Sequence, residues 1–224
     1  MFDIFSLGSS TIYQNKFIMK GFSSLYAFNL INYIKQIDHT VPFEQFKSQF
    51  YHHAVKRELI FKILPYLRTN KIESLNDKVT YYDELTHVVS QKYDRGIDIV
   101  GDIDRTHTLL VHCKQYSESQ SINKADVEQM AALTALYKTR NFQKDSLSIL
   151  VSPYTISDEA LNKMNDIPMN IAYAQVNDLP IDEIPLVNST NIMDITKLTS
   201  ANGQLLNFIP NKSCTKTFLI KDKK

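Results

Sequence analysis

The sequence predicts an α/β domain in which helices flank a mixed β-sheet. Two short strand-like runs, Ile97–Val100 and Thr108–Lys114, are separated by a polar turn and predict a hairpin. The continuous apolar run "LSILVS" at Leu147–Ser152 is typical of a strand buried on both faces. Helical patterns lie before and between these strands. This alternation favours a layered domain with both parallel and antiparallel strand pairs.

The first half of the chain is expected to be helical before the hairpin. Residues 22–36 and 43–64 have helical patterns, and the second helix carries apolar side chains at three- and four-residue spacing. These side chains are Phe43, Phe46, Phe50, Ala54 and Phe61. A polar connection is expected after Pro65, up to about Gln91, with one strand near Lys78–Tyr82.

Capping residues mark the helices of the second half. Asn123 is a suitable N-cap with Asp126 at the third helical position, which predicts a helix to about Asn141. Ser157 is expected to cap a shorter helix, and "NIAYAQV" at 170–176 is expected to be the last strand.

Length and composition predict one main domain in the 224 residues. We expect an N-terminal segment over 1–40, a core over 41–176 and an irregular extension over 177–224. Cys113 and Cys214 are too few for a disulfide framework, and no pair of them has zinc-site spacing. No apolar run reaches the roughly 18–20 residues that a membrane span needs.

The N-terminal segment has two open interpretations. Its first 36 residues contain one acid, Asp3, together with three lysines and many aromatic side chains. This composition is similar to that of a mitochondrial presequence, but arginine is absent, so a plain N-terminal helix is an equal alternative.

The expected hairpin carries charged side chains inside its strands. His112 and Lys114 are two residues apart, so their side chains project from the same face of the strand. If the chain turns near Arg105, counting places Asp98 opposite His112 on the neighbouring strand. A metal-binding carboxylate, a second ligand and a lysine suit phosphodiester hydrolysis. A cross-strand ion pair between Asp98 and Lys114 on a solvated face is the simpler alternative.

Four other residues need an interpretation. Glu58 lies near the edge of the apolar stripe, where a carboxylate is unexpected without a partner, and a rim residue whose carboxylate reaches water is the simpler alternative. His52 and His53 are adjacent on a helix, so they cannot chelate one ion together, and we expect them at the surface. Cys113 as a nucleophile beside His112 is disfavoured, because adjacent strand residues point to opposite faces, and we expect Cys113 to be a small buried core residue.

Several of these segments resemble a known family. "DRGIDIVG" at 94–101, "LLVHCKQY" at 109–116, "ADVEQM" at 125–130 and "SILVS" at 148–152 resemble the Mrr-type branch of the PD-(D/E)xK superfamily. "FYHHAVKREL" at 50–59 is similar to the fungal mitochondrial required-for-respiratory-growth protein seven family. The resemblance implies a restriction endonuclease-like mixed β-sheet flanked by helices.

The resemblance also implies roles for individual residues. Asp98 matches the metal-binding acid, Lys114 the catalytic lysine, and Cys113 the residue whose backbone carbonyl completes the metal shell. Asp94 matches an accessory acid, and Gly96 the small residue between the two acids. The implied cofactor is Mg²⁺ or Mn²⁺.

The chain departs from the family pattern at two positions. His112 stands where the superfamily has Glu or Asp and this branch has Gln, and imidazole is a softer ligand than Mg²⁺ prefers. His52 aligns with a glutamate that the family carries on its first helix, which leaves Glu58 as a candidate substitute.

The expected function is metal-dependent phosphodiester hydrolysis of mitochondrial nucleic acid, DNA rather than RNA, in genome maintenance or respiratory growth. The alternative is a nuclease-fold factor that binds nucleic acid without turnover. Superfamily enzymes often act as dimers, so a homodimer is compatible with either role. Phosphate contacts are expected from four basic residues and from the lysines of the C-terminal tail. The four residues are Lys56, Arg57, Lys62 and Lys124.

Overall fold

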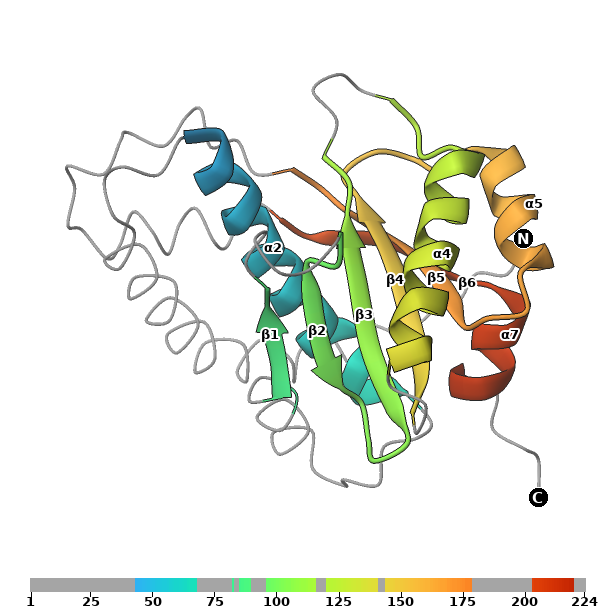
Figure 1. Cartoon of the computed structure of the whole chain (residues 1–224). Coiled ribbons are helices and arrows are strands. Elements are labelled where there is room, and N and C mark those ends of the chain that lie inside the picture. Colours follow the sequence, from blue (N-terminus) through green and yellow to red (C-terminus); the bar gives the residue numbers. More distant parts are fainter. Residues whose placement is uncertain are drawn as a thin grey trace, which may run out of the picture. The chain divides into compact units, whose positions relative to one another are not determined.

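The computed structural model describes seven parts of the chain (Figure 1). They are residues 43–67, 82, 85–89, 96–115, 120–140, 144–178 and 203–219. Apart from Phe43, all of them belong to one compact unit, 44–179 together with 203–224. The expected segment 1–40 and its helix over 22–36 lie outside the described residues.

A six-stranded mixed sheet forms the centre of this unit. The strands are β1 (Thr86–Val88), β2 (Ile99–Asp102), β3 (His107–Cys113), β4 (Asp145–Ser152), β5 (Ile171–Val176) and β6 (Leu205–Pro210). They are ordered along the sheet as they are in the chain. The strands β3, β4 and β5 are mutually parallel, and the other neighbours are antiparallel. The expected hairpin and mixed sheet are confirmed.

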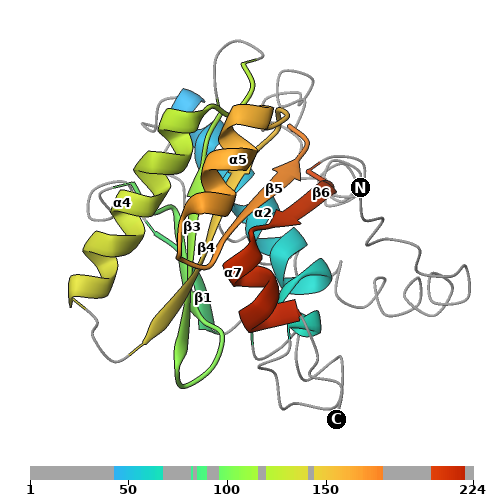
Figure 2. The same cartoon turned by 90° about the vertical axis from the view of Figure 1, so that its right-hand side faces the viewer.

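Helices cover both faces of the sheet (Figures 1 and 2). Helices α4 (Lys124–Arg140) and α5 (Asp158–Asp166) connect the parallel strands and lie on one face. Two crossovers of the same hand, advancing in one direction across the sheet, place both helices on that face. Helix α2 (Phe43–Lys62) lies on the opposite face.

Local side-chain contacts explain where α4 and α5 begin. The Asn123 carboxamide oxygen accepts from the Asp126 N–H at 3.3 Å, and the Asp126 carboxylate accepts from the Asn123 N–H at 3.0 Å. This reciprocal pair is a capping box. The Ser157 hydroxyl accepts from the Ala160 N–H at the start of α5, as the sequence predicts.

The core lies on both sides of the sheet. Against α4 and α5, a cluster of buried apolar residues includes Leu110, Val127, Met130, Leu150 and Tyr173. On the other side, most apolar positions of α2 after residue 50 are buried, including Tyr51, Ala54, Val55, Leu59 and Ile60, while Phe61 is half-buried. The parallel strands therefore read as continuous apolar runs.

Two strands were not expected from the sequence. The sequence predicts a polar connection at Thr86–Val88, yet this segment forms β1 and pairs with β2. Gly101 permits this close pairing, because a Cβ atom there would lie 2.7 Å from the Thr86 hydroxyl. Of the strand expected at Lys78–Tyr82, only Tyr82 is described, and it is helical and buried.

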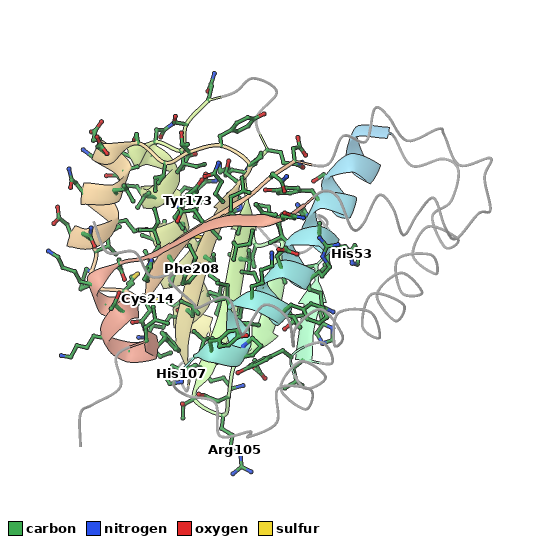
Figure 3. The ribbon with its side chains drawn as sticks, turned by 180° about the vertical axis from the view of Figure 1, so that it is seen from behind. His53, Arg105, His107, Tyr173, Phe208 and Cys214 are labelled. Carbon is green, nitrogen blue, oxygen red and sulfur yellow. The ribbon has the colours of Figure 1, made fainter. Side chains whose placement is uncertain are left out.

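The C-terminal segment corrects the expected irregular extension over 177–224. Residues 205–210 form β6 on the edge of the sheet, followed by α7 (Lys212–Cys214) and a π-helical turn (Thr215–Leu219). Figure 3 shows Phe208 and Cys214 in this segment, and both are buried.

Asn211 explains why this segment belongs to the core. Its fully buried carboxamide donates to the carbonyls of Met164, Ile167 and Met169, and it accepts from the Cys214 N–H at 2.8 Å. A single side chain thus satisfies several backbone groups between α5 and β5, which the local sequence does not reveal.

Among the described helices, none is long and apolar enough to cross a lipid bilayer.

Candidate active site at the open end of the hairpin

The hairpin places Asp98 beside His112, as the sequence predicts. Ile99 pairs with Val111 in the β2–β3 ladder, so Asp98 lies opposite His112 just before β2 begins. The Nδ1 atom of His112 lies 3.2 Å from Oδ2 of Asp98. Both residues are more than 90% buried, at 9% and 7% exposure, so the pair is largely shielded from water.

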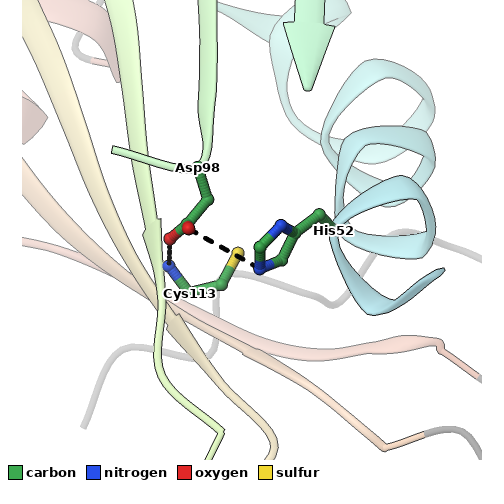
Figure 4. Close-up of side chains that lie close together, drawn as sticks. All are labelled: His52, Asp98 and Cys113. Carbon is green, nitrogen blue, oxygen red and sulfur yellow. Dashed lines mark hydrogen bonds and ion pairs between the residues drawn. The ribbon is translucent and has the colours of Figure 1, made fainter. Parts of the chain in front are cut away.

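Two further residues complete the surroundings of Asp98 (Figure 4). The Cys113 N–H donates to Oδ2 at 2.6 Å, and Nε2 of His52 on α2 lies 3.7 Å from Oδ1. One ligand atom each from His52, Asp98 and Cys113 lie within 4.8 Å of one another. Nitrogen, oxygen and sulfur donors from three elements thus meet at one point.

Gly96 shapes the entry of the chain into this site. Its φ of +102° is a conformation that L side chains rarely adopt, and a Cβ atom there would lie 3.3 Å from Leu133 and 3.9 Å from the His112 ring. The small residue two positions before Asp98 is therefore required by the backbone. Asp94 lies outside the described residues.

The position of the site agrees with the general rule for parallel sheets. His112 and Cys113 end β3, which is parallel to β4 and lies inside the sheet. Ligands of open α/β sheets bind beyond the carboxyl ends of such strands.

His112 has one nitrogen without a partner among the described residues. Its Nε2 atom is buried and makes no hydrogen bond there. The Asp98 carboxylate accepts a hydrogen bond from the Nδ1–H group of His112. Nε2 is therefore the ring nitrogen that remains open to a proton or a ligand. A buried nitrogen without a hydrogen-bond partner costs folding free energy, so such an atom is a candidate for a functional role.

Lys114 projects toward α4. Its Nζ donates to the Gln129 side-chain oxygen at 2.7 Å and lies 3.5 Å from the Asp126 carboxylate. In the described part of the chain, the ionic partner of Lys114 is therefore Asp126, and the simple ion pair between Asp98 and Lys114 is not formed. The side chain is 20% exposed.

The two helix residues named as accessory have different surroundings. His52 is 4% exposed and faces Asp98, which corrects the expectation that it lies at the surface. Ser48 also contacts its Nε2 at 3.3 Å. His52 is buried because α2 packs against Asp98 and the end of β3, a long-range contact that the helical pattern does not reveal.

Glu58 has an explanation of its own. Its buried carboxylate is held by Lys62 at 2.6 Å, by Arg57 at 3.2 Å and by the Leu205 N–H at 2.7 Å. It thus connects α2 to the start of β6, and it is absent from the donor group of Asp98 that the described residues form.

The expected basic residues are dispersed. Arg57 is committed to Glu58 and to the Gly203 carbonyl, and Lys62 shares Glu58. Lys124 lies 3.8 Å from Glu159 with both side chains exposed. Lys212 and Lys216 are exposed at the C-terminal end of the described chain, and Lys56 is half-buried.

The Cys113 thiol is unsuited to nucleophilic attack at neutral pH. Burial raises its pKa well above the ordinary range, and the Asp98 carboxylate raises it further. The thiol is protonated under these conditions, so a Cys113 nucleophile is disfavoured on chemical grounds as well as by its orientation.

Comparison with known proteins identifies the family. The family described as restriction endonuclease matches residues 69–191, more than half of the chain. The chain belongs to this restriction endonuclease family. The match includes β1 to β5 with Asp98, His112 and Lys114, whereas His52 and the rest of α2 precede it. Searches of curated proteins and of solved structures found no match.

The side chains around Asp98 do not fit Mg²⁺. This ion prefers six oxygen ligands in near-octahedral geometry. Asp98 is the one carboxylate of the donor group, and its Oδ2 is already engaged by Cys113 and His112. The remaining donors are an imidazole and a thiol, which suit softer cations.

Proposed function

We propose that this chain hydrolyses phosphodiester bonds of nucleic acid, DNA rather than RNA, with a divalent cation bound at Asp98. The observation that carries the proposal is the register that sets Asp98 opposite His112, two residues before Lys114, in a chain of the restriction endonuclease family. The open end of the hairpin thus carries both a carboxylate that can bind a cation and a lysine.

Each side chain has a role that its surroundings support. Lys114 is held at its Nζ by Gln129 and can stabilise negative charge that develops on a phosphate. Asp98 orients His112 through Nδ1, so Nε2 is available to accept or hold a proton. The cation, when bound, would polarise a phosphate oxygen.

The proposal extends to the setting in which the protein works. The resemblance of residues 50–59 to a mitochondrial family and the low acid content of the first 36 residues support a role in mitochondrial DNA maintenance or respiratory growth. Fractionation of cells expressing the tagged full chain tests this location, and recovery outside mitochondria would contradict it.

The test of the activity is cleavage of end-labelled single- and double-stranded DNA and RNA with Mg²⁺, Mn²⁺ or Zn²⁺. Lys114→Ala is compared with Lys138→Ala, because each lysine pairs with an aspartate. Lys138 is a control because it lies near the C-terminal end of α4 and pairs with Asp145 at the start of β4. We expect Lys114→Ala to reduce the rate about 100-fold, as is typical for loss of one charge-stabilising group, and Lys138→Ala to leave it unchanged. Parental cleavage by Lys114→Ala would contradict the assigned role.

A second candidate is nucleic-acid binding without turnover. It is favoured by the two histidines, His52 and His112, at positions where the resemblance implies other ligands, and by the engagement of Asp98 with protein donors. Retained DNA binding without cleavage under any of the three cations would select this alternative.

A further inference from the structure

The donor atoms around Asp98 point to a cation that accepts nitrogen and sulfur. The imidazole Nε2 of His52 lies 3.7 Å from Oδ1 of Asp98, and the Cys113 thiol completes a group within 4.8 Å. Imidazole, carboxylate and thiolate together are typical ligands of Zn²⁺, whereas Mg²⁺ selects oxygen alone.

The spacing is close to what a tetrahedral ion needs. Zinc bonds of about 2.0–2.3 Å at tetrahedral angles place ligand atoms roughly 3.4–3.6 Å apart. The separation of 3.7 Å between His52 and Asp98 is already near this range. An upper limit of 4.8 Å for the group requires inward movements of at most roughly 1 Å.

The surroundings of the group hold its central ligand in place. Oδ2 of Asp98 is fixed by the Cys113 N–H and by His112, which leaves Oδ1 directed toward His52. Outer hydrogen bonds of this kind orient metal ligands. The Cys113 sulfur makes no hydrogen bond within the described residues, so metal binding there displaces no sulfur partner.

We propose that His52 Nε2, Asp98 Oδ1 and Cys113 Sγ bind Zn²⁺ in preference to Mg²⁺. The inference deepens the proposed function by naming its cation, and it rests on that function only for the use of the ion in hydrolysis. Three protein ligands leave one position of a tetrahedral ion open, as in catalytic zinc sites. Binding deprotonates the Cys113 thiol and competes with the Ser48 contact to His52.

This site has no zinc-type spacing in the sequence, because its ligands come from α2, the start of β2 and the end of β3. His52 also lies before the residues that match the family. The proposed ligand set is thus a property of this chain's own α2.

The first experiment titrates the full chain with Co²⁺, a spectroscopic substitute for Zn²⁺. A sulfur ligand produces a charge-transfer band in the near ultraviolet, which a site made of oxygen and nitrogen lacks. We expect this band in the parent chain, its loss with Zn²⁺, and its persistence in excess Mg²⁺. Displacement of Co²⁺ by stoichiometric Mg²⁺ would overturn the proposal.

Two matched pairs of variants locate the ligands. Cys113→Ser should remove the band, and Cys214→Ser should keep it, because Cys214 is a buried thiol on α7. His52→Gln should weaken Co²⁺ binding about tenfold or more, whereas His53→Gln on the next helix position should not. A band retained in Cys113→Ser, or lost equally in Cys214→Ser, contradicts the assignment, and circular dichroism checks that each variant is folded.

Cleavage and binding fail separately. Lys114→Ala should retain the Co²⁺ band while losing cleavage, because Lys114 is not a ligand. A chain that cleaves DNA with Mg²⁺ and shows no sulfur band overturns the zinc proposal and leaves the nuclease proposal standing. A chain that shows the band but does not cleave nucleic acid would support the zinc site and overturn the nuclease proposal.

Discussion

The β2–β3 hairpin carries an aspartate–histidine pair at each end, and the two pairs are built differently. At the turn, Asp104 contacts His107 at 3.0 Å, and at the open end Asp98 contacts His112 at 3.2 Å. Figure 3 shows Arg105 at the tip of the turn with His107 close by. The residue types and distances are similar, so the difference lies in the other partners of each aspartate.

The turn aspartate is satisfied by its own neighbours. Oδ1 of Asp104 accepts from the Thr106 N–H at 2.7 Å, the Thr106 hydroxyl at 2.8 Å and the His107 N–H at 2.8 Å. Such local contacts stabilise tight turns. The His107 ring also packs edge-on against Phe218, with centroids 5.0 Å apart.

The open-end aspartate has partners from distant parts of the chain. His52 comes from α2 and Cys113 from the end of β3. In the Asp98–His112 pair, the Nε2 atom of His112 has no partner among the described residues. A carboxylate saturated by adjacent backbone groups stabilises a turn, whereas one that gathers distant ligand atoms is available for chemistry. The same two residue types thus have structural and functional roles in one hairpin.

The largest expected effect separates the two aspartates by activity. Asp98→Asn should reduce DNA cleavage about 100-fold or more, because it removes the one carboxylate of the donor group, while Asp104→Asn should leave the rate within about twofold. Single-turnover cleavage of labelled DNA measures both. Equal losses in the two variants would show that the pairs do not differ in function.

The next effect concerns the stability that Asp104 gives to the turn. Asp104→Ala should lower the free energy of unfolding by about 1–2 kcal/mol, since the turn loses several hydrogen bonds. Asp102→Ala, which removes an exposed ion pair to Lys144, should cost about 0.5 kcal/mol or less. Urea unfolding compares the two, and an Asp104→Ala protein as stable as the parent would refute the turn role.

A smaller effect depends on pH. Burial raises the pKa of Asp104, but hydrogen bonds from Thr106 and His107 outweigh it and hold the pKa below the ordinary value of 3.8. The folded pKa is therefore below the unfolded pKa, so the stabilisation is complete above about pH 4 and is lost as the pH falls through the folded value.

This sign can be measured against a neutral variant. The stability difference between the parent and Asp104→Asn should be constant near neutral pH and shrink in acid. A difference that stays constant down to pH values below about 3 would contradict a lowered pKa for Asp104.

The smallest effect concerns the position of Lys114. Gln129→Ala removes the 2.7 Å hydrogen bond to Nζ, which is worth about 0.5–1.5 kcal/mol and corresponds to a two- to tenfold lower cleavage rate. Glu128→Ala is the control. Glu128 is the neighbour of Gln129 on α4, but its carboxylate pairs with Lys163 of α5 and not with Lys114. No change in rate for Gln129→Ala would mean that Lys114 is positioned by other contacts.

Local signals in the sequence predicted much of this structure. The β2–β3 register that brings Asp98 to His112 follows from strand alternation and a turn near Arg105, and the caps at Asn123 and Ser157 follow from short-range hydrogen bonding. These features depend on residues close together in the chain.

Features that depend on distant residues were not predicted. The burial of His52 requires α2 to pack over the end of β3, and β6 requires Glu58 and Asn211 to satisfy backbone groups far away in sequence. The sequence around Asn211 does not indicate that its side chain makes five hydrogen bonds to backbone groups.

Cleavage by chelator-treated protein tests the central claim most directly. The full chain is stripped of cations, mixed with end-labelled DNA, and given Zn²⁺, Mn²⁺ or Mg²⁺ alongside Asp98→Asn and Asp104→Asn. We predict that a cation restores cleavage in the parent and in Asp104→Asn but not in Asp98→Asn. Cleavage in the presence of chelator, or equal restoration in Asp98→Asn, would contradict a cation-dependent site at the open end of the hairpin.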